Sequence, residues 1–437
     1  MLRGSALVFL SRNLQKVVAL LITILLGRML QERGVGTYGL LVATLTFASA
    51  LGTLGLGPAH VYLRGQGRMS VQNVLANAFV GAAVFGVGAI LLFSLLRPVL
   101  RLDAVSPGLL TLLSLVFPLA ILQSYLDFLW QGENRLGTFS ALYCLRAVSL
   151  LGFLLLGMQF ADPFEGIGYA LILNLVFTVT VSALLVARRY GLRLSFRFDL
   201  FKDSLRYGLR VQPGSLAQTI GYRLDFYLLN IFLGPQSLGI YVVATNLAEA
   251  LWMAPYALSI ALLPRVSTNN AAEAQRVTAQ ALRLTFVLSI VSGLAVFALS
   301  ELLIRLAYGP RFLPAAPVLR ILLVGTVVFS MQKVLANYFI GQGRAGWFLR
   351  ATLLAMAVNL GLNLVLIPAW GVPGAAFASA VSYSLSTLVL GGLFLRWSGS
   401  SLRDVLLPTA ADVRQVQQGL GRIRRSAVRL AHGGLAR

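Results

Sequence analysis

The chain has 437 residues, of which 58% are hydrophobic and only 11% are charged, and its mean hydropathy is +0.81. This composition excludes a water-soluble domain of any usual kind and indicates a membrane protein. The formal charge of +22 would suit nucleic-acid binding in a soluble chain, but basic residues in a membrane protein mark cytoplasmic loops and contacts with anionic lipid.

Apolar segments long enough to cross a bilayer, which takes about 20 residues, follow one another along the chain. The first is interrupted by Arg12 and Lys16, so it is not a cleavable signal peptide. The sequence predicts an all-α polytopic membrane protein with twelve transmembrane helices. We expect them at about 8–30, 36–58, 74–96, 108–131, 138–159, 166–187, 208–233, 238–262, 281–304, 316–341, 346–368 and 372–395.

The loops between these segments fall into a set rich in Lys and Arg and a set with few of these residues. The basic set includes the stretch from Arg188 to Arg210 and the tail from Arg396 to Arg437. Loops rich in Lys and Arg stay in the cytoplasm, and an even number of spans puts both termini on one side. We therefore expect a multi-pass protein of the cytoplasmic (inner) membrane with both termini in the cytoplasm.

The two halves of the chain resemble each other. TYGLLVAT begins at Thr37 and LGIYVVAT begins at Leu238, and the segments that follow Gln131 and Gln342 also match in order and spacing. Because each unit has six spans, the repeat is parallel, as in many transporters whose sites lie between the halves. The expected domains are a lobe at 1–187, a basic linker at 188–207, a lobe at 208–396 and a basic tail at 397–437.

Four cations are expected at similar depth in the inner half of the predicted helices. A charge at mid-bilayer costs roughly 2.5–3.5 kcal/mol, so each should face a partner or a wet cavity. Such a cavity would attract a phosphate or pyrophosphate. The predicted substrate-binding residues are Arg12, Lys16, Arg146 and Lys333. The alternative is that each cation extends to the interface or pairs with a carboxylate.

The other charges inside helices are expected to couple transport or to join the lobes. Asp127 lies near the cytoplasmic end of its helix and could pair with Arg146. Arg223 and Asp225 are two residues apart and face different sides. Glu249 is a candidate protonatable coupling group, although a structural hydrogen bond would serve it equally well.

The sequence shows no enzyme motif. It has no Walker-type phosphate loop, and one cysteine and two histidines far apart make no metal cluster, so no cofactor or metal is expected. The tail from Asp412 has apolar residues three and four apart with arginines between them. It is interpreted either as a basic amphipathic helix on the anionic inner leaflet or as a solvated tail.

Three stretches carry a resemblance to a known family. They are GVGTYGLLVATLTFASALGTLGLGPA near Gly34, RLDFYLLNIFLGPQSLGIYVVATNLAEALWMAPYALSIALLPRV from Arg223, and IPAWGVPGAAFASAVSYSLSTLVL from Ile367. They resemble the Wzx-type polysaccharide biosynthesis family, the lipid-linked oligosaccharide flippases of the multidrug and oligosaccharidyl-lipid exporter superfamily. The resemblance covers nearly the whole chain. It implies a V-shaped fold of two lobes around a basic cavity.

The resemblance also implies a function. It is the transfer of a polyprenyl-pyrophosphate-linked glycan from the inner to the outer leaflet by alternating access, for surface polysaccharide such as O-antigen or exopolysaccharide. A glycan polymerase and glycosyltransferases are possible partners, and anionic lipid is another. The alternatives are a cation-coupled multidrug antiporter of the same superfamily, a peptidoglycan lipid-precursor flippase, a membrane glycosyltransferase or polymerase, and a scaffold of a glycan assembly complex.

Overall fold

The structure is a computed structural model that describes residues 2–191, 193–253, 255, 266 and 271–407. Within these residues the chain forms helices and short loops, with no strand. The predicted amphipathic helix of the tail from Asp412 lies outside the described residues.

The first half of the chain supplies seven helices and the connector a further one. They are α1 (Leu2–Thr53), α2 (Leu56–Gly65), α3 (Val71–Leu100), α4 (Pro107–Leu115), α5 (Phe117–Gly132), α6 (Leu136–Gly157), α7 (Pro163–Tyr190) and the connecting helix α8 (Phe198–Val211). The second half supplies α9 (Pro213–Gly221), α10 (Leu224–Ala250), α12 (Ala271–Ala307), the 3-10 turn η1 (Pro310–Phe312), α13 (Ala315–Gly341), α14 (Ala345–Trp370), α15 (Val372–Ser398) and the short α16 (Leu402–Leu406).

Ten of the described segments are long and apolar enough to cross a membrane. Two of these, Leu7–Thr53 and Pro213–Ala250, are long enough to cross twice. Each contains a residue with non-helical backbone angles, Gln31 (φ 59°) in α1 and Gly234 (φ 80°) in α10. Divided at these residues, the ten segments give the twelve predicted helices, so the predicted fold class is confirmed.

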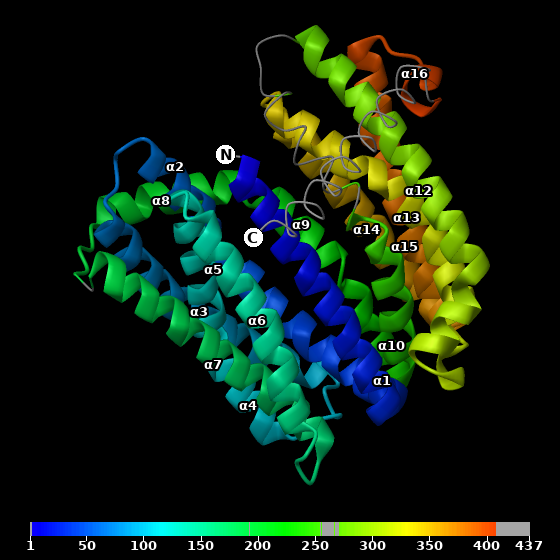
Figure 1. The fold of residues 1–437 in the computed structure, drawn as a ribbon, viewed down its shortest axis with the longest axis horizontal. Helices are drawn as coiled ribbons and strands as arrows, with labels where there is room; N and C mark the ends of the chain where they lie inside the picture. Colours follow the sequence, from blue (N-terminus) through cyan, green and yellow to red (C-terminus); the bar gives the residue numbers. More distant parts are fainter. Residues whose placement is uncertain (1, 192, 254, 256–265, 267–270, 408–437) are drawn as a thin grey trace, which may run out of the picture.

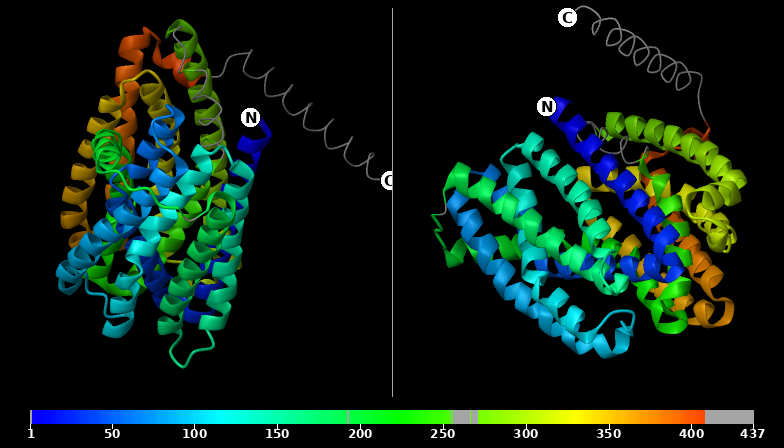
Figure 2. Two further views of the ribbon diagram at one scale, coloured as in Figure 1. Left: turned by 90° about the vertical axis from the view of Figure 1, so that its left-hand side faces the viewer. Right: turned by 60° about the horizontal axis from the view of Figure 1, so that its bottom comes forward.

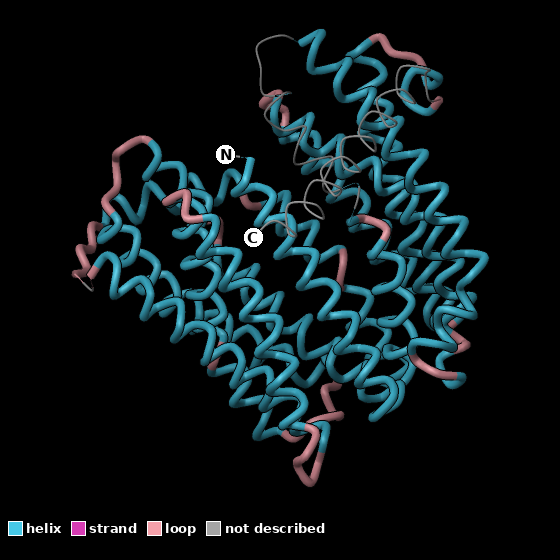
Figure 3. The backbone as a smooth tube through the Cα atoms, viewed as in Figure 1, coloured by secondary structure: helices cyan, strands magenta, loops and turns pink. Residues whose placement is uncertain are grey.

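The helices form two groups that diverge toward the side carrying the N-terminus of the chain, α2, α8 and α16 (Figure 1). One group contains α2 to α7 and the other contains α9 to α16, while α1 runs between them. Two further views show the same two groups (Figure 2), and the loops gather at the two ends of the bundles (Figure 3). The molecule has the expected V shape.

The structure differs from the predicted boundaries in the middle of the chain. The span expected at 208–233 begins at Pro213 and is interrupted at Tyr222 and Arg223, between α9 and α10. The expected linker at 188–207 is partly helical, because its apolar residues fall on one face and α8 buries Leu200 against the first lobe. The inner loop expected at 263–280 is helical from Ala271.

The helix α8 docks on the first lobe through aromatic and glycine contacts. Tyr207 stacks on Tyr62 of α2, with ring centroids 4.4 Å apart. The backbones of Gly55 and Gly208 touch, since a Cβ at Gly208 would lie 2.5 Å from the carbonyl oxygen of Leu54. The connector is thus packed against α2, and Gly55 has the positive φ of 75° that glycine allows.

The lobes meet where α1 crosses α10, at one glycine from each of the two helices. A Cβ at Gly36 would lie 1.8 Å from the carbonyl oxygen of Pro235, and one at Gly239 would lie 1.9 Å from that of Glu32. Only glycine permits such an approach of two backbones. The backbones of α1 and α10 therefore touch at this crossing, and a side chain at either glycine would push the helices apart.

Hydrogen bonds between the lobes close the end opposite to the divergence. Arg28 of α1 donates to the carbonyl oxygen of Ala307, at the end of α12, over 2.7 Å. Asn230 of α10 donates to the carbonyl oxygens of Leu100 and Arg101, at the end of α3, over 3.1 and 2.8 Å. Each lobe therefore satisfies free C-terminal carbonyls of a helix in the other lobe.

Candidate functional site

A cavity of about 600 Å³ lies in the first lobe, lined by α1, α5, α6 and α7 and bordered by Thr219 of α9. Its deeper wall is apolar and includes Ile22 and Leu171. Its polar lining gathers charged, amide and hydroxyl side chains. They include Gln15, Lys16, Ser49, Gln123, Ser124, Asp127, Tyr143, Arg146, Asn174 and Thr178.

An ion pair joins two helices of this cavity. The guanidinium of Arg146 on α6 lies 3.0 Å from both carboxylate oxygens of Asp127 on α5, as the alternative interpretation of the sequence allowed. Gln123 donates to the same carboxylate over 3.1 Å. The ring of Tyr143 lies under the guanidinium, 5.1 Å from its carbon. Side-chain exposures of 22% for Arg146 and 13% for Asp127 show that the pair faces the cavity from partly buried positions.

Lys16 is the second cation of the cavity. Its side chain is exposed, and among the described residues no carboxylate lies within ion-pair distance of it. It interacts electrostatically with Glu249 and Arg223 of the second lobe. Lys16 therefore carries a positive charge at the junction of the lobes that no carboxylate of the described residues pairs with directly.

The other two predicted cations do not line this cavity. Arg12 lies on α1 one turn before Lys16, nearer the diverging end. Lys333 lies on α13 in the second lobe and reaches Lys16 only through electrostatic interaction. The structure thus brings Lys16 and Arg146 together at one cavity, while Lys333 has a different environment.

The break between α9 and α10 is held by a second ion pair. Arg223 donates to both carboxylate oxygens of Glu249, over 2.6 and 3.2 Å. It also donates to the carbonyl oxygen of Tyr222 over 3.0 Å, which the interruption of the helix leaves free. Glu249 is therefore bound on both oxygens by a residue of the same lobe.

Lys333 lies among aromatic rings of the second lobe. Its Nζ is 4.7 Å from the ring centroids of Tyr222 and Trp252 and 4.9 Å from that of Phe329. It donates a hydrogen bond to the hydroxyl of Tyr222. Tyr222 stands at the helix break, so the interruption of the span aims this ring at Lys333.

Asp225 is buried in a polar network that joins α10, α14 and α15. The hydroxyls of Tyr241 and Ser379 donate to one of its carboxylate oxygens, the latter over 3.2 Å. Asn359 donates to Ser379 over 3.3 Å, and Asn363 donates to Asn359 over 3.0 Å. As expected, Asp225 and Arg223 do not pair with each other.

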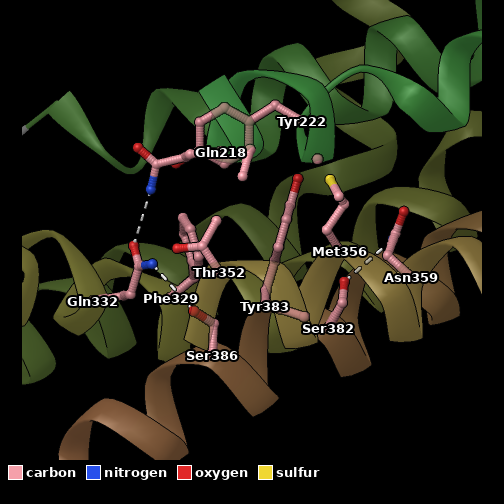
Figure 4. A pocket seen from close by; sticks show the side chains of 13 residues that line it. Gln218, Tyr222, Phe329, Gln332, Thr352, Met356, Asn359, Ser382, Tyr383 and Ser386 are labelled. Atoms are coloured by element: carbon pink, nitrogen blue, oxygen red, sulfur yellow. Dashed lines mark hydrogen bonds between the residues drawn. The ribbon is translucent and has the colours of Figure 1, made fainter. Parts of the chain in front are cut away.

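A small pocket of about 30 Å³ lies beside this network and beside the aromatic rings (Figure 4). Gln218 and Gln332 approach each other across it, 3.4 Å apart, and Tyr222 and Tyr383 enter from opposite sides. The sequence does not predict the aromatic rings around this pocket. In the sequence Trp252 and Phe329 look like ordinary apolar residues of membrane helices, because only the tertiary fold places them around a lysine.

Within the described part of the chain, no group of three or more His, Cys, Asp or Glu side chains could hold a metal ion. Among the described residues two ion pairs, Arg146–Asp127 and Arg223–Glu249, lie near Lys16 and Lys333, which have no carboxylate within ion-pair distance. This arrangement suits binding of an anion through positive side chains and of a polar ligand through amides and hydroxyls.

Comparison with known proteins identifies the family. The family model described as polysaccharide biosynthesis protein matches residues 1–270. The chain belongs to this family. A second model, described as MatE, matches residues 214–365.

Curated relatives agree with this assignment. The chain is 24% identical over 267 residues to the probable low-salt glycan biosynthesis flippase Agl15 of Haloferax volcanii, a match that covers 59% of the chain and 55% of that protein. It is 22% identical over 245 residues to the teichuronic acid biosynthesis protein TuaB of Bacillus subtilis, covering 54% of the chain and 49% of that protein. The chain therefore spans about half the length of the curated relatives it matches.

Solved structures share the fold over nearly the whole chain. The lipid II flippase MurJ in an inward closed conformation superposes with a TM-score of 0.74 at 14% identity, over 93% of this chain and 89% of that one. A multidrug resistance MATE family transporter in an inward-facing conformation gives 0.73 at 14% identity, over 88% of this chain and 94% of that one. At this identity the likeness establishes the fold alone.

Proposed function

We propose that the chain is a flippase that moves a polyprenyl-pyrophosphate-linked oligosaccharide from the inner to the outer leaflet of the cytoplasmic membrane, for surface polysaccharide synthesis. The observation that carries the proposal is the lining of the 600 Å³ cavity, which combines Lys16 and Arg146 with amides and hydroxyls. Cations bind the pyrophosphate, and uncharged polar groups bind sugar hydroxyls. The prenyl tail stays in lipid.

The two cavity cations have different tasks in this proposal. Lys16 has no ion-pair partner among the described residues and makes the first contact with the phosphate. Arg146 then exchanges Asp127 for a phosphate oxygen, since its guanidinium already faces the cavity. Arg12 adds positive charge toward the diverging end, and Lys333 adds to the positive potential from the second lobe.

Transport would proceed by alternating access of the two lobes. The diverging end of the V faces the cytoplasm in this proposal, with both termini, because the basic segment from Arg188 to Arg210 lies on that side. The bonds of Arg28 and Asn230 at the opposite end close the outer path. The lobes correspond to 1–187 and 208–396, with Asp225 and the Arg223–Glu249 pair at coupling or lobe-contact positions. Anionic lipid, glycosyltransferases and a polymerase are the proposed partners.

A cation-coupled multidrug antiporter is the second candidate, favoured by the MatE match over residues 214–365. Such a protein needs a carboxylate free to bind a cation. The carboxylate of the cavity, Asp127, is already bound by Arg146, so the cavity suits an anion better. A peptidoglycan lipid-precursor flippase would share the pyrophosphate chemistry and differ in the sugar.

Binding to the purified protein separates these candidates. We expect farnesyl pyrophosphate, a short polyprenyl pyrophosphate, to bind saturably and to weaken as salt rises, because the contact is ionic. We expect tetraphenylphosphonium not to compete with it. Binding of tetraphenylphosphonium without binding of farnesyl pyrophosphate would favour the antiporter and refute the proposal.

A further inference from the structure

The environment of Lys333 has the form of a binding site for an organic cation, but the cation belongs to the chain itself. Three rings surround its Nζ at 4.7–4.9 Å. In the described part of the chain no carboxylate lies within ion-pair distance of this nitrogen. Aromatic faces alone, with one phenol hydroxyl, hold the ammonium. Aromatic cages of this kind recognise ammonium ligands through the negative faces of the rings.

A fourth ring joins these three, and the four support one another independently of Lys333. Tyr383 of α15 packs on Phe329 with centroids 4.7 Å apart, and Trp252 packs on Phe329 at 5.2 Å. Tyr222 lies edge-on to both Phe329 and Tyr383. We name Tyr222, Trp252, Phe329 and Tyr383 the aromatic cage. Its members come from the α9–α10 break, from the residues after α10, from α13 and from α15.

Hydrogen bonds hold the ring of one member of the cage and the main chain of another. The indole N–H of Trp252 donates to the carbonyl oxygen of Thr326 over 3.2 Å. Tyr222 stands at the helix break, where Arg223 binds its carbonyl oxygen. A cage fixed in this way should keep its shape when the ammonium is removed.

We propose that Lys333 is a tethered cation that fills this cage and thereby excludes organic ammonium ions from the second lobe. The cage with Lys333 absent is a binding site for a primary alkylammonium. In the native chain an incoming cation meets an occupied cage and the positive charge of Lys16, while the carboxylate of Glu249 is bound by Arg223. Lys333 is therefore a residue that determines specificity, whatever ligand the cavity of the first lobe carries.

The test removes the tether and supplies the lost group as a separate molecule. Lys333→Ala deletes three carbons and an ammonium, which together are n-propylammonium. We expect labelled n-propylammonium to bind saturably to Lys333→Ala and to raise its melting temperature. Wild type should not bind it. Lys333→Met, which keeps a long side chain in the cage without charge, is the matched control and should not bind it either.

A second variant assigns the binding to the cage. Trp252→Leu, added to Lys333→Ala, should weaken n-propylammonium binding by roughly tenfold, because it removes one of the three rings. A folded Lys333→Ala that binds n-propylammonium no better than Lys333→Met does would overturn the proposal. If Lys333→Ala aggregates, purification in n-propylammonium decides the matter: recovery of monodisperse protein supports the proposal, and continued aggregation refutes it.

Discussion

Replacing Asp127 by asparagine should make the cavity bind pyrophosphate more tightly. In the structure Asp127 holds the guanidinium of Arg146 at 3.0 Å, so an arriving phosphate must displace a carboxylate and then lie close to it. The Asp127→Asn change keeps the size of the side chain and its contact with Gln123 but removes the negative charge. Arg146 can then bind the pyrophosphate without having to release a carboxylate.

The magnitude follows from the geometry. A phosphate on the cavity side of Arg146 would lie about 6 Å from Asp127, and at an effective dielectric of about 20–40 the repulsion is about 1.5–3 kcal/mol. Asp127→Asn should therefore strengthen binding of farnesyl pyrophosphate at least tenfold. Its cost in stability should be modest, about 1–2 kcal/mol, because the pair is partly exposed and screened.

The assay is equilibrium binding of farnesyl pyrophosphate together with thermal unfolding of each variant. Arg146→Gln should lose binding and stability, whereas the double variant Arg146→Gln/Asp127→Asn should recover stability without recovering binding. Asp199→Asn is the matched control, since the Arg197–Asp199 pair is 60% exposed on both sides and lies outside the cavity. Weaker binding by Asp127→Asn, or unchanged binding by Arg146→Gln, would refute the reasoning.

Two further predictions concern the contact between the lobes. Gly239→Ala should reduce the free energy of unfolding by roughly 1–3 kcal/mol and so lower the melting temperature, because its Cβ would lie 1.9 Å from the backbone oxygen of Glu32. Gly361→Ala is the control, since Gly361 has open space around it. Equal effects of the two changes on the melting temperature would contradict the packing argument. Arg28→Ala should open the closed end. In a Cys144→Ser background with Val42→Cys in the cavity wall, an impermeant maleimide added from that side should then label the new cysteine faster than it does when Arg28 is present. An unchanged labelling rate would show that the bond to Ala307 does not hold this end shut.

Much of the fold could be predicted from the sequence. The length of the apolar segments indicates the number of membrane spans, and the Lys and Arg content of the loops indicates the side of the membrane on which each loop lies. The parallel repeat was also visible, since TYGLLVAT and LGIYVVAT mark the helices that meet at Gly36 and Gly239. The turn inside α1 leaves less trace, because Gln31 has a positive φ of 59° without being glycine. The break at Tyr222 and Arg223 follows a single glycine, Gly221, which is a weaker signal than the Gly234-Pro235 pair. Arg223 at the break binds Glu249.

The site was predictable only in part. Depth along a helix placed Lys16 and Arg146 at a similar level, and both line one cavity; their role in binding substrate stays a prediction. Depth does not tell which way a side chain points, so it could not separate Lys333, which faces three aromatic rings, from the cavity cations. Glu249 was expected to couple transport, yet its carboxylate is bound by Arg223; whether it also couples transport stays a prediction.

The central claim is that the cavity cations carry a pyrophosphate-linked glycan across the membrane. The most direct measurement is a proteoliposome assay with a fluorescent polyprenyl-pyrophosphate-linked disaccharide, in which an impermeant reductant reports the fraction in the outer leaflet over time. The account predicts translocation by wild type, and loss of it in Lys16→Gln and in Arg146→Gln/Asp127→Asn, the variant that keeps its fold. Translocation at the wild-type rate by these folded variants, or none by wild type, would contradict it.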